Sequence, residues 1–255
     1  MSIRARRAGR LARCAAAVAV AGVAAAGGAI PAAAATPTGD APVVHPPDHA
    51  VFALRDPRIG ESSGLAVASR ERGVYFTHND SGDSARFFAV DSTGRTLATF
   101  DVRGAPAVDW EDMATAPGPD GTSSVWLADI GDNGANHPSV TVYVVAEPRV
   151  TRGSAGTRTL PVTATYRLRY PDRPHDAETL LVDPVRRRAF IVTKSMTGRS
   201  DVYALPARPT RRSVATLRHV GSLAFGVTGS AGGPLGLLGA LPATGGAPRL
   251  SLIHI

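Results

Sequence analysis

Five carboxylates recur at matching places in three segments of the chain. Glu61, Asp109 and Asp176 each stand four residues before a large apolar residue, and Glu111 and Glu178 follow two residues after the second and third of these acids. Carboxylates that gather in one place repel one another unless a cation neutralises them or their pKa values rise. Oxygen ligands from several segments suit Ca²⁺, which takes six to eight ligands in a loose geometry, or Mg²⁺ with retained waters. The pattern therefore predicts a divalent-cation site, with Ca²⁺ as the first candidate.

The same five acids also have a purely structural interpretation. Acids at the start of strands accept hydrogen bonds from backbone amides and can hold neighbouring sheets together. Lys194, the sole lysine, stands close after the third acidic segment and could meet these acids as an internal counter-ion. Such an ion pair would weaken the case for a metal.

A second set of acidic and amide side chains is expected in loops. It comprises Asp80, Asp129, Asp132 and Asn133. Asp and Asn form tight turns because their side chains cap nearby amides, so turn formation is the favoured role and metal binding the alternative. An EF-hand would also need a distal glutamate and flanking helices, which this sequence does not offer.

Two histidines are candidates for a catalytic base or a metal ligand. His78 precedes Asn79 and Asp80, and His175 precedes Asp176. A histidine beside an acid is also a common hydrogen-bond partner within a turn or strand, and that interpretation stays open for both.

Gly60 to Gly64 matches the G-x-S-x-G pattern of a serine nucleophile. That nucleophile needs a turn from a strand into a helix, with an acid and a histidine following in order. The segment is expected to be a strand, and the matching segments have no serine there, so we interpret the match as a coincidence.

An internal repeat determines where the acids lie. Each acid-bearing segment is followed by three more short apolar runs between Gly, Asp, Ser and Asn turns, which predicts β-strands. The expected strands cover 61–69, 74–77, 88–90 and 95–102, then 109–117, 125–128, 143–145 and 162–168, then 176–184, 189–192, 203–205 and 213–220. The three repeats therefore lie near 59–103, 107–169 and 174–221.

The repeat favours an all-β fold, a β-propeller of four-stranded blades. A β-sandwich also has many short strands, but it gives no reason for an acid at the head of every fourth strand. The first strand of each propeller blade lines the central channel, where the acids would converge. Because propellers have about four to eight blades, residues 51–228 are expected to form an incomplete propeller of about three blades and the start of a fourth.

Residues 1–35 are expected to be a secretory signal peptide. Arginines up to Arg13 precede a short Ala-rich apolar run, and small residues lead to an expected cleavage near Ala35. The run is too short to span a membrane, so no transmembrane segment is expected after cleavage. Arg6-Arg7 hints at twin-arginine export, but the residues that follow favour general secretion. We expect a secreted, extracellular protein in which residues 36–50 form a Pro-rich linker.

The charge of the chain excludes one class of partner. The leader holds five of the 28 Lys and Arg and none of the 21 acids, which leaves 23 bases against 21 acids in the rest. A protein that coats nucleic acid needs clustered positive charge on its folded domain, so nucleic acid is not expected as a partner.

Residues 229–255 differ from the repeats in composition. They are rich in Gly, Ala, Leu and Pro and lack the Asp and Asn turns, and Leu250–Ile255 resembles a peptide translated from sequencing-adapter read-through. We interpret this end as the aberrant tail of a truncated gene, with a genuine apolar tail as the alternative.

Several phrases together resemble a family of secreted, mainly actinobacterial β-propeller proteins of uncharacterised function. They are ESSGLA (61–66), HNDSGD (78–83), DWED (109–112), DIGDN (129–133) and HDAETLLV (175–182). The resemblance implies a complete propeller in other members and brings no activity. The layout is more distantly similar to phytase-like and gluconolactonase-like propellers, which hold divalent metal near the axis, but no catalytic residue is carried over from them.

Two functions follow from these residues. The first is a secreted binding or interaction module for an unidentified ligand or protein, with a divalent cation at the acids. The alternative is a metal-dependent hydrolase, a phosphoesterase or lactonase, in which the acids bind metal that activates water. An enzyme needs an open coordination position and a base such as His78 or His175 within reach.

Overall fold

The computed structural model describes residues 52–151, 153–210 and 213–224, all within one compact unit that spans His49–Ile255. The described part is all-β, with thirteen strands and no helix. Accordingly, none of these residues belongs to a helix that could cross a membrane. The expected leader (1–35), linker (36–50), fourth-blade start (from about 227) and tail (229–255) lie outside the described residues.

The first four strands form an antiparallel sheet in chain order. They are β1 (Ser62–Val67), β2 (Val74–Asn79), β3 (Arg86–Asp91) and β4 (Thr96–Arg103). Their turns follow from local chemistry, as between β3 and β4. There Asp91 Oδ1 accepts a hydrogen bond from Thr93 N at 2.9 Å, and Gly94 has the positive φ of 79° that favours glycine.

The same arrangement occurs twice more. The second sheet contains β5 (Trp110–Pro117), β6 (Ser123–Asp129), β7 (Val140–Ala146) and β8 (Thr157–Arg169). The third contains β9 (Ala177–Asp183), β10 (Arg188–Thr193), β11 (Arg199–Ala204) and β13 (Arg218–Ala224). The short β12 (Ala215–Thr216) pairs in parallel with the end of β8.

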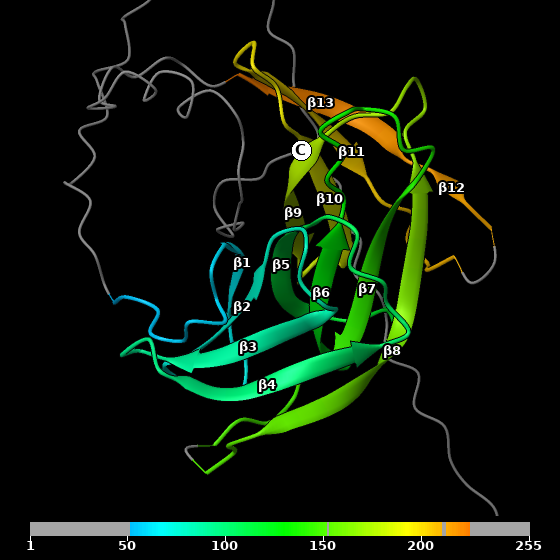
Figure 1. Cartoon of the computed structure of the whole chain (residues 1–255). Helices are drawn as coiled ribbons and strands as arrows, with labels where there is room; N and C mark the ends of the chain where they lie inside the picture. Colours follow the sequence, from blue (N-terminus) through cyan, green and yellow to red (C-terminus); the bar gives the residue numbers. More distant parts are fainter. Residues whose placement is uncertain (1–51, 152, 211–212, 225–255) are drawn as a thin grey trace, which may run out of the picture. The chain divides into compact units, whose positions relative to one another are not determined.

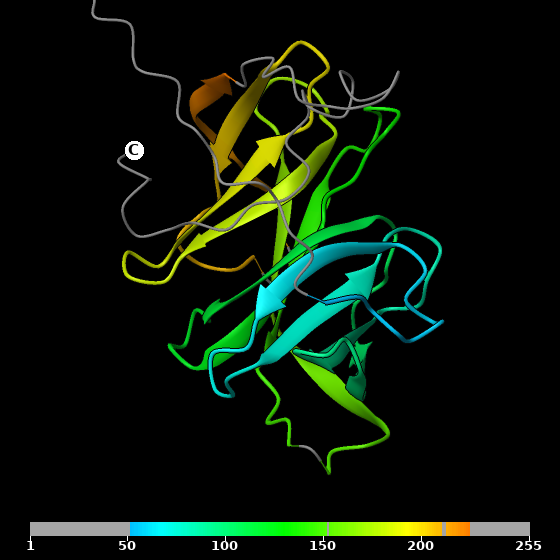
Figure 2. The ribbon, with the colours of Figure 1, turned by 90° about the vertical axis from the view of Figure 1, so that its left-hand side faces the viewer.

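The long strand β8 joins the first two sheets. Its second half pairs with β7 and its beginning pairs in parallel with β4, which gives the eight-stranded path β1-β2-β3-β4-β8-β7-β6-β5 (Figure 1). The two ends of this path lie beside each other, because Thr115 Oγ1 of β5 donates to the carbonyl oxygen of Val67 in β1 at 2.6 Å. The path therefore nearly closes into a barrel-like sheet. The third sheet, yellow to orange, is a separate ribbon (Figure 2).

Apolar side chains fill the spaces between the sheets. The first cluster, which contains Phe76, Phe87 and Phe100, lies between the first and second sheets. The second lies between the second and third sheets, where Trp126 stacks on Tyr166 with 5.5 Å between ring centroids. A third, smaller cluster lies on the other face of the third sheet. Each sheet is thus held to the next by its side chains.

The sequence predictions at the level of strands are confirmed. Each segment expected to be a strand overlaps a strand of the structure, and the described part is all-β as expected. The main difference is β8, which has 13 residues and begins at Thr157, whereas the apolar pattern marked only 162–168. The first half of β8 is mostly exposed, so it carries little apolar signal. Ser62 lies in β1 and no helix follows it, which agrees with the coincidental match to G-x-S-x-G.

Candidate metal centre

One backbone hydrogen bond is repeated in all three sheets and places the acids. The residue that ends or follows the second strand donates its N–H to the carbonyl oxygen of the first acid of the same sheet. The bonds run from Asp80 to Glu61 (2.9 Å), from Ile130 to Asp109 (3.2 Å) and from Lys194 to Asp176 (2.8 Å). Asp80, Ile130 and Lys194 are therefore equivalent positions, each beside the first acid of its sheet.

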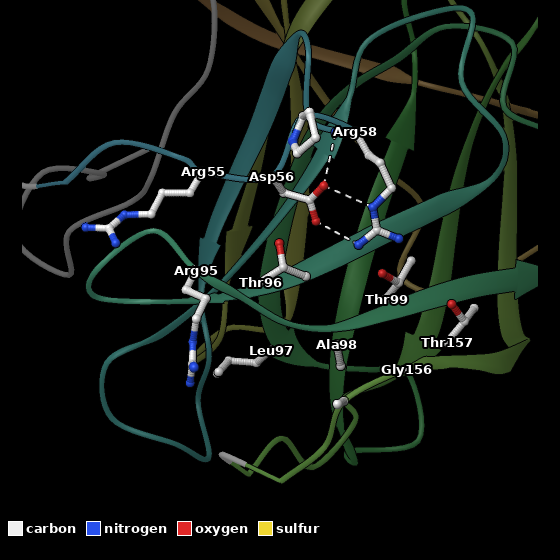
Figure 3. A pocket seen from close by; sticks show the side chains of 12 residues that line it. Arg55, Asp56, Arg58, Arg95, Thr96, Leu97, Ala98, Thr99, Gly156 and Thr157 are labelled. Carbon is white, nitrogen blue, oxygen red and sulfur yellow. Dashed lines mark hydrogen bonds and ion pairs between the residues drawn. The ribbon is translucent and has the colours of Figure 1, made fainter.

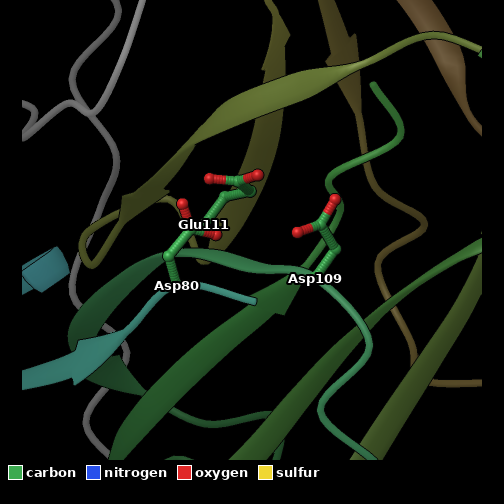
Figure 4. A group of neighbouring side chains, drawn as sticks. All are labelled: Asp80, Asp109 and Glu111. Atoms are coloured by element: carbon green, nitrogen blue, oxygen red, sulfur yellow. The ribbon is translucent and has the colours of Figure 1, made fainter. Parts of the chain in front are cut away.

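Three carboxylates form an acid cluster where the first and second sheets meet. Asp80, Asp109 and Glu111 each have a carboxylate oxygen within 4.8 Å of the others, and Figure 4 shows the three groups facing a common space. Glu111 is only 5% exposed, whereas Asp80 and Asp109 are half-buried. Hard oxygen ligands from two sheets at such separations can hold a divalent cation.

A glycine allows the backbone to approach this acid cluster. A Cβ atom at Gly131 would lie 2.3 Å from Asp109 Oδ2 and 2.5 Å from Glu111 Oε1, which is closer than real Cβ contacts. Gly131 belongs to the loop after β6, in the DIGDN phrase. The absence of a side chain therefore leaves the carboxylate oxygens room beside the main chain of this loop.

The electrostatics of the acid cluster favour a cation. Burial raises the pKa of Glu111 to about 8, and the negative charges of Asp80, Glu178, Asp109 and Asp176 raise it further. The pKa of Asp109 is also raised, first by burial and then by Asp80 and Asp176. Within the described residues, no Lys, Arg or His lies within 4.0 Å of a carboxylate oxygen of the three. A bound cation would reverse these shifts and bring Glu111 into its charged form.

The acids of the third sheet are neutralised differently. Lys194 Nζ lies 3.8 Å from Asp176 Oδ2 and donates a hydrogen bond to Glu178 Oε1. Burial lowers the pKa of Lys194, but the hydrogen bond to Glu178 and the surrounding negative charges raise it by more. Asp176 also accepts a 2.8 Å hydrogen bond from Asp132 N. The ion pair that the sequence left open is thus present, and it is made with the third-sheet acids.

Glu61 does not join the acid cluster. Its side chain is exposed, and its place beside Asp109 and Glu111 is taken by Asp80, whose N–H bonds to the Glu61 carbonyl. Sequence reasoning placed Asp80 in the loop set because HNDSGD has the composition of a turn. The available signal was the position of Asp80 after the second strand, which matches that of Lys194.

The other loop residues act mainly in turns and contacts to the backbone. Asp129 Oδ1 accepts a hydrogen bond from Asp109 N at 2.8 Å and so positions one member of the acid cluster. Burial raises the pKa of Asp129 despite hydrogen bonds from backbone amides. Asp132 accepts hydrogen bonds from the backbone N–H groups of Asn136 (3.0 Å) and His137 (2.8 Å), and Asn133 is exposed in the same turn.

His78 is fully buried at the core side of β2. Its Nδ1 lies 2.7 Å from the carbonyl oxygen of Asn79, and its ring packs edge-on against Trp110. Burial lowers the pKa of His78, so it is neutral at pH 7. This histidine therefore packs in the core against Trp110, and its Nε2 is buried without a hydrogen-bond partner among the described residues.

His175 belongs to an aromatic cluster of the third sheet. Its Nε2 lies 2.9 Å from Asp172 Oδ2 and 3.2 Å from the Tyr203 hydroxyl, and its ring packs against Tyr170. These contacts hold the ring in place against Asp172, Tyr170 and Tyr203.

Two buried acids that link the sheets were not anticipated. Asp112 in β5 accepts a 2.8 Å hydrogen bond from Leu180 N of the third sheet. Glu147 accepts hydrogen bonds from Ser69 and Ser123, and so ties the first sheet to the second. Glu147 follows a strand, and the other repeats have no acid at the equivalent place. Its sequence position therefore gave no reason to predict a contact between sheets. Asp112 stands in DWED, but its role depends on the third sheet.

Several cavities open on the described surface, and two of them are lined by charged side chains of note. One, of about 440 Å³, is lined by Arg55, Arg58 and Arg95 together with β4 and the start of β8 (Figure 3). In it Asp56 accepts two hydrogen bonds from the Arg58 side chain, which holds the pKa of Asp56 well below its usual range. The other, of about 480 Å³, adjoins Gly131 and is lined by Asp129 and His137 among others.

Comparison with known proteins gives no family for this chain. No protein-family model matches it, and no curated protein matches its sequence.

Proposed function

We propose that this chain is an exported β-propeller binding module that holds a divalent cation, with Ca²⁺ first, at Asp80, Asp109 and Glu111. The observation that carries the proposal is the acid cluster itself. Its most buried member, Glu111, has a pKa of about 8, and no cationic side chain of the described residues pairs with it. Export is inferred from the arginines and the apolar run of residues 1–35.

The strand arrangement supports the propeller. Three groups of four antiparallel strands follow one another along the chain, the first two joined by the pairing of β4 with β8, and apolar clusters fill the space between consecutive groups. The first strands are neighbours in chain order, since β1 contacts β5 and β5 contacts β9. First strands that line a common channel, each heading a four-stranded blade, are the defining feature of a propeller.

The two histidines expected as a base, His78 and His175, are both held by other contacts, which favours binding over hydrolysis. A metal-dependent hydrolase needs a base within hydrogen-bond reach of the metal-bound water. His78 is buried against Trp110, and His175 is held by Asp172 and Tyr203. The cation is therefore proposed to bind an oxygen-rich ligand or to stabilise the junction of the two sheets.

Thermal unfolding of the full chain with EDTA and with Ca²⁺ tests the proposal. A cation that binds only the folded state adds about 2.7 kcal/mol of stability at a hundredfold excess over Kd. We expect this gain in the wild type and its loss in Glu111→Gln. The matched control is Glu178→Gln, the same change at the equivalent place in the third sheet, which should keep the gain. A wild type that Ca²⁺ and Mg²⁺ do not stabilise would overturn the cation proposal.

A further inference from the structure

One face of the second sheet ends in a group of polar side chains. Asp129, Thr141 and Arg167 lie directly opposite one another on the neighbouring strands β6, β7 and β8, so they share a face (Figure 1). Two residues further along that face, Tyr143 lies opposite Thr165. Tyr143 also belongs to the apolar cluster between the first two sheets, so this is the face that turns toward the first sheet. Three hydroxyl groups, a carboxylate and a guanidinium therefore stand together where the apolar cluster ends.

The cavity of about 480 Å³, here called the second-sheet cavity, opens over this group of side chains. Its other walls are two loops. The connection from β4 to β5 contributes Pro106 and Val108, and the connection from β6 to β7 contributes His137, Pro138 and Ser139. The volume falls within the range of about 300–1,000 Å³ that small-molecule sites occupy. The cavity thus combines a polar floor with loops that carry both apolar and polar groups.

Hydrogen bonds hold both loops in place. The indole Nε1 of Trp110 donates to the carbonyl oxygen of Pro106 at 3.2 Å, which fixes the first loop. The Asp132 carboxylate accepts a 2.8 Å hydrogen bond from the backbone N–H of His137, which fixes the second. A cavity whose walls are already ordered loses less conformational entropy when a ligand binds.

The charged groups at the equivalent level of the other two sheets are satisfied within the protein. In the first sheet, Arg86 pairs with Asp83 at 2.9 Å. In the third sheet, Asp201 accepts a hydrogen bond from the Ser222 hydroxyl. Arg167 of the second sheet is exposed, and among the residues that the structure describes no carboxylate oxygen lies within 4.0 Å of its guanidinium. The second sheet therefore presents a cation without an internal partner at the cavity.

The electrostatics of Tyr143 show that these groups act on a common space. Burial raises the pKa of Tyr143, and the negative charge of Asp129 raises it further. A hydrogen bond with the Thr141 side chain and the positive charge of Arg167 act in the opposite direction. The Tyr143 hydroxyl thus lies near a second hydroxyl and within reach of the guanidinium charge.

We propose that the second-sheet cavity binds a uronic acid, a sugar that carries a carboxylate, as the ligand of the binding module. The inference rests on the proposed function. A guanidinium pairs with a carboxylate through two parallel N–H···O bonds, which assigns the carboxylate to Arg167. The hydroxyls of Thr141 and Tyr143 match the hydroxyls of a sugar ring, because each can both donate and accept. Pro106 and Val108 offer apolar contact to the C–H groups of the ring.

The cavity adjoins the acid cluster through one residue. Gly131 lines the cavity, and a Cβ atom there would lie 2.3 Å from Asp109 Oδ2. Ligand and cation would therefore bind on two sides of the same loop. Arg167 and Thr141 are not among the three acids of the cluster, so substitutions at these two positions separate the ligand site from the cation site.

Titration of the full chain with D-glucuronate, followed by NMR at about 0.15 M salt, tests the ligand. D-Glucose, acetate and inorganic phosphate are the comparison ligands, since each offers only the hydroxyls or only the negative charge. We expect glucuronate to bind roughly ten- to a hundredfold more tightly than any of the three, because hydrogen bonds to charged groups add to those of the hydroxyls. Glucose or phosphate binding as tightly as glucuronate would overturn the proposal.

Two variants test the assigned contacts. Arg167→Met should reduce the affinity for glucuronate to that for glucose, and Thr141→Val should weaken glucuronate about three- to tenfold. Arg218→Met, the same change at an exposed arginine outside the cavity, should leave both affinities unchanged. Thermal unfolding checks that each variant is folded. A folded Arg167→Met that binds glucuronate like the wild type would overturn the assignment of the carboxylate.

Each titration is carried out in EDTA and again in Ca²⁺, so the two proposals fail separately. If Ca²⁺ stabilises the wild type but glucuronate binds under neither condition, the uronic acid proposal is wrong and the cation proposal stands. If glucuronate binds through Arg167 but Ca²⁺ does not stabilise the chain, the cation proposal fails and the ligand assignment stands.

Discussion

The acid cluster and the acid pair of the third sheet share a backbone hydrogen bond, but the side chain beside their acids has the opposite charge. In both places the residue after the second strand donates its N–H to the first acid of its sheet. In the third sheet that residue is Lys194, and it neutralises Asp176 and Glu178. In the first sheet it is Asp80, which adds a third carboxylate to Asp109 and Glu111. The side chain at this equivalent position is therefore negative in the first sheet and positive in the third.

The pKa of Glu111 follows this difference. Glu111, without a cationic partner among the described residues, has a pKa of about 8 because of burial and four neighbouring acids. Its equivalent Glu178 is in direct contact with Lys194. Protonation or a bound metal would neutralise Glu111, whereas an ion pair with Lys194 neutralises Glu178.

The largest expected effect comes from giving the first sheet the residue of the third. Asp80→Lys places a cation beside Asp109 and Glu111 and removes one ligand, so we expect Ca²⁺ affinity to fall at least a hundredfold. Unfolding in EDTA should occur at a higher temperature, since the acids gain a partner. The control is Ser81→Lys, one residue further along in an exposed turn. Retained calcium binding in Asp80→Lys, measured by calorimetry, would contradict the role of Asp80.

The reverse change removes the internal cation of the third sheet. Lys194→Met leaves Asp176 and Glu178 without their partner, and breaking such partly buried pairs should lower the free energy of unfolding by about 1–3 kcal/mol. Arg186→Gln, which breaks an exposed pair with Asp183, should cost less than about 1 kcal/mol. Chemical denaturation measures both, and equal losses would show that Lys194 has no special role.

The pH dependence of stability should depend on Glu111. The folded-state pKa of Glu111 is raised to about 8 from 4.5, so its protonated form contributes stability at low pH that is lost as the pH rises through about 8. In EDTA the free energy of unfolding should fall between about pH 5 and 8, by at most about 1.4 kcal/mol per pH unit from this group. Glu111→Gln should flatten the slope. An unchanged slope in Glu111→Gln would show that another group causes the pH dependence.

The smallest effect is expected from the glycine beside the acid cluster. Gly131→Ala pushes a Cβ atom against Asp109 and Glu111, so their oxygens must shift and Ca²⁺ affinity should fall about three- to tenfold. Gly60→Ala is the control, because a Cβ atom there meets nothing within 4 Å. If both variants bind Ca²⁺ like the wild type, the close approach at Gly131 is not part of the site.

The sequence allowed the strands to be predicted well because the apolar runs and turn residues repeat. It also placed Asp109, Glu111, Asp176 and Glu178 at the heads of their sheets. The residue that lies beside each pair of acids was harder to predict. It depends on which residue follows the second strand and so comes next to the first acid. Asp80 has the local signature of a turn, and its contact with Asp109 crosses from one sheet to the next.

Contacts between sheets were the least predictable. Asp112 bonds to Leu180 N and Glu147 bonds to Ser69, and both links join residues at least 68 positions apart without a repeated pattern. The exposure of Leu65 could not be predicted either, because its equivalents Met113 and Leu180 are buried. The repeat explains why Leu65 is apolar. Its exposure arises because no described sheet packs before the first sheet.

A calorimetric titration of the full chain with Ca²⁺ at pH 7, in two buffers of different ionisation enthalpy, tests the central claim most directly. A Glu111 carboxyl with a pKa of about 8 is roughly 90% protonated at that pH, so its conversion to a metal ligand must release a proton. We expect one ion per chain with release of a proton, and neither in Glu111→Gln. No binding to the wild type, or equal binding to Glu111→Gln, would contradict the assignment of Asp80, Asp109 and Glu111 as a cation site.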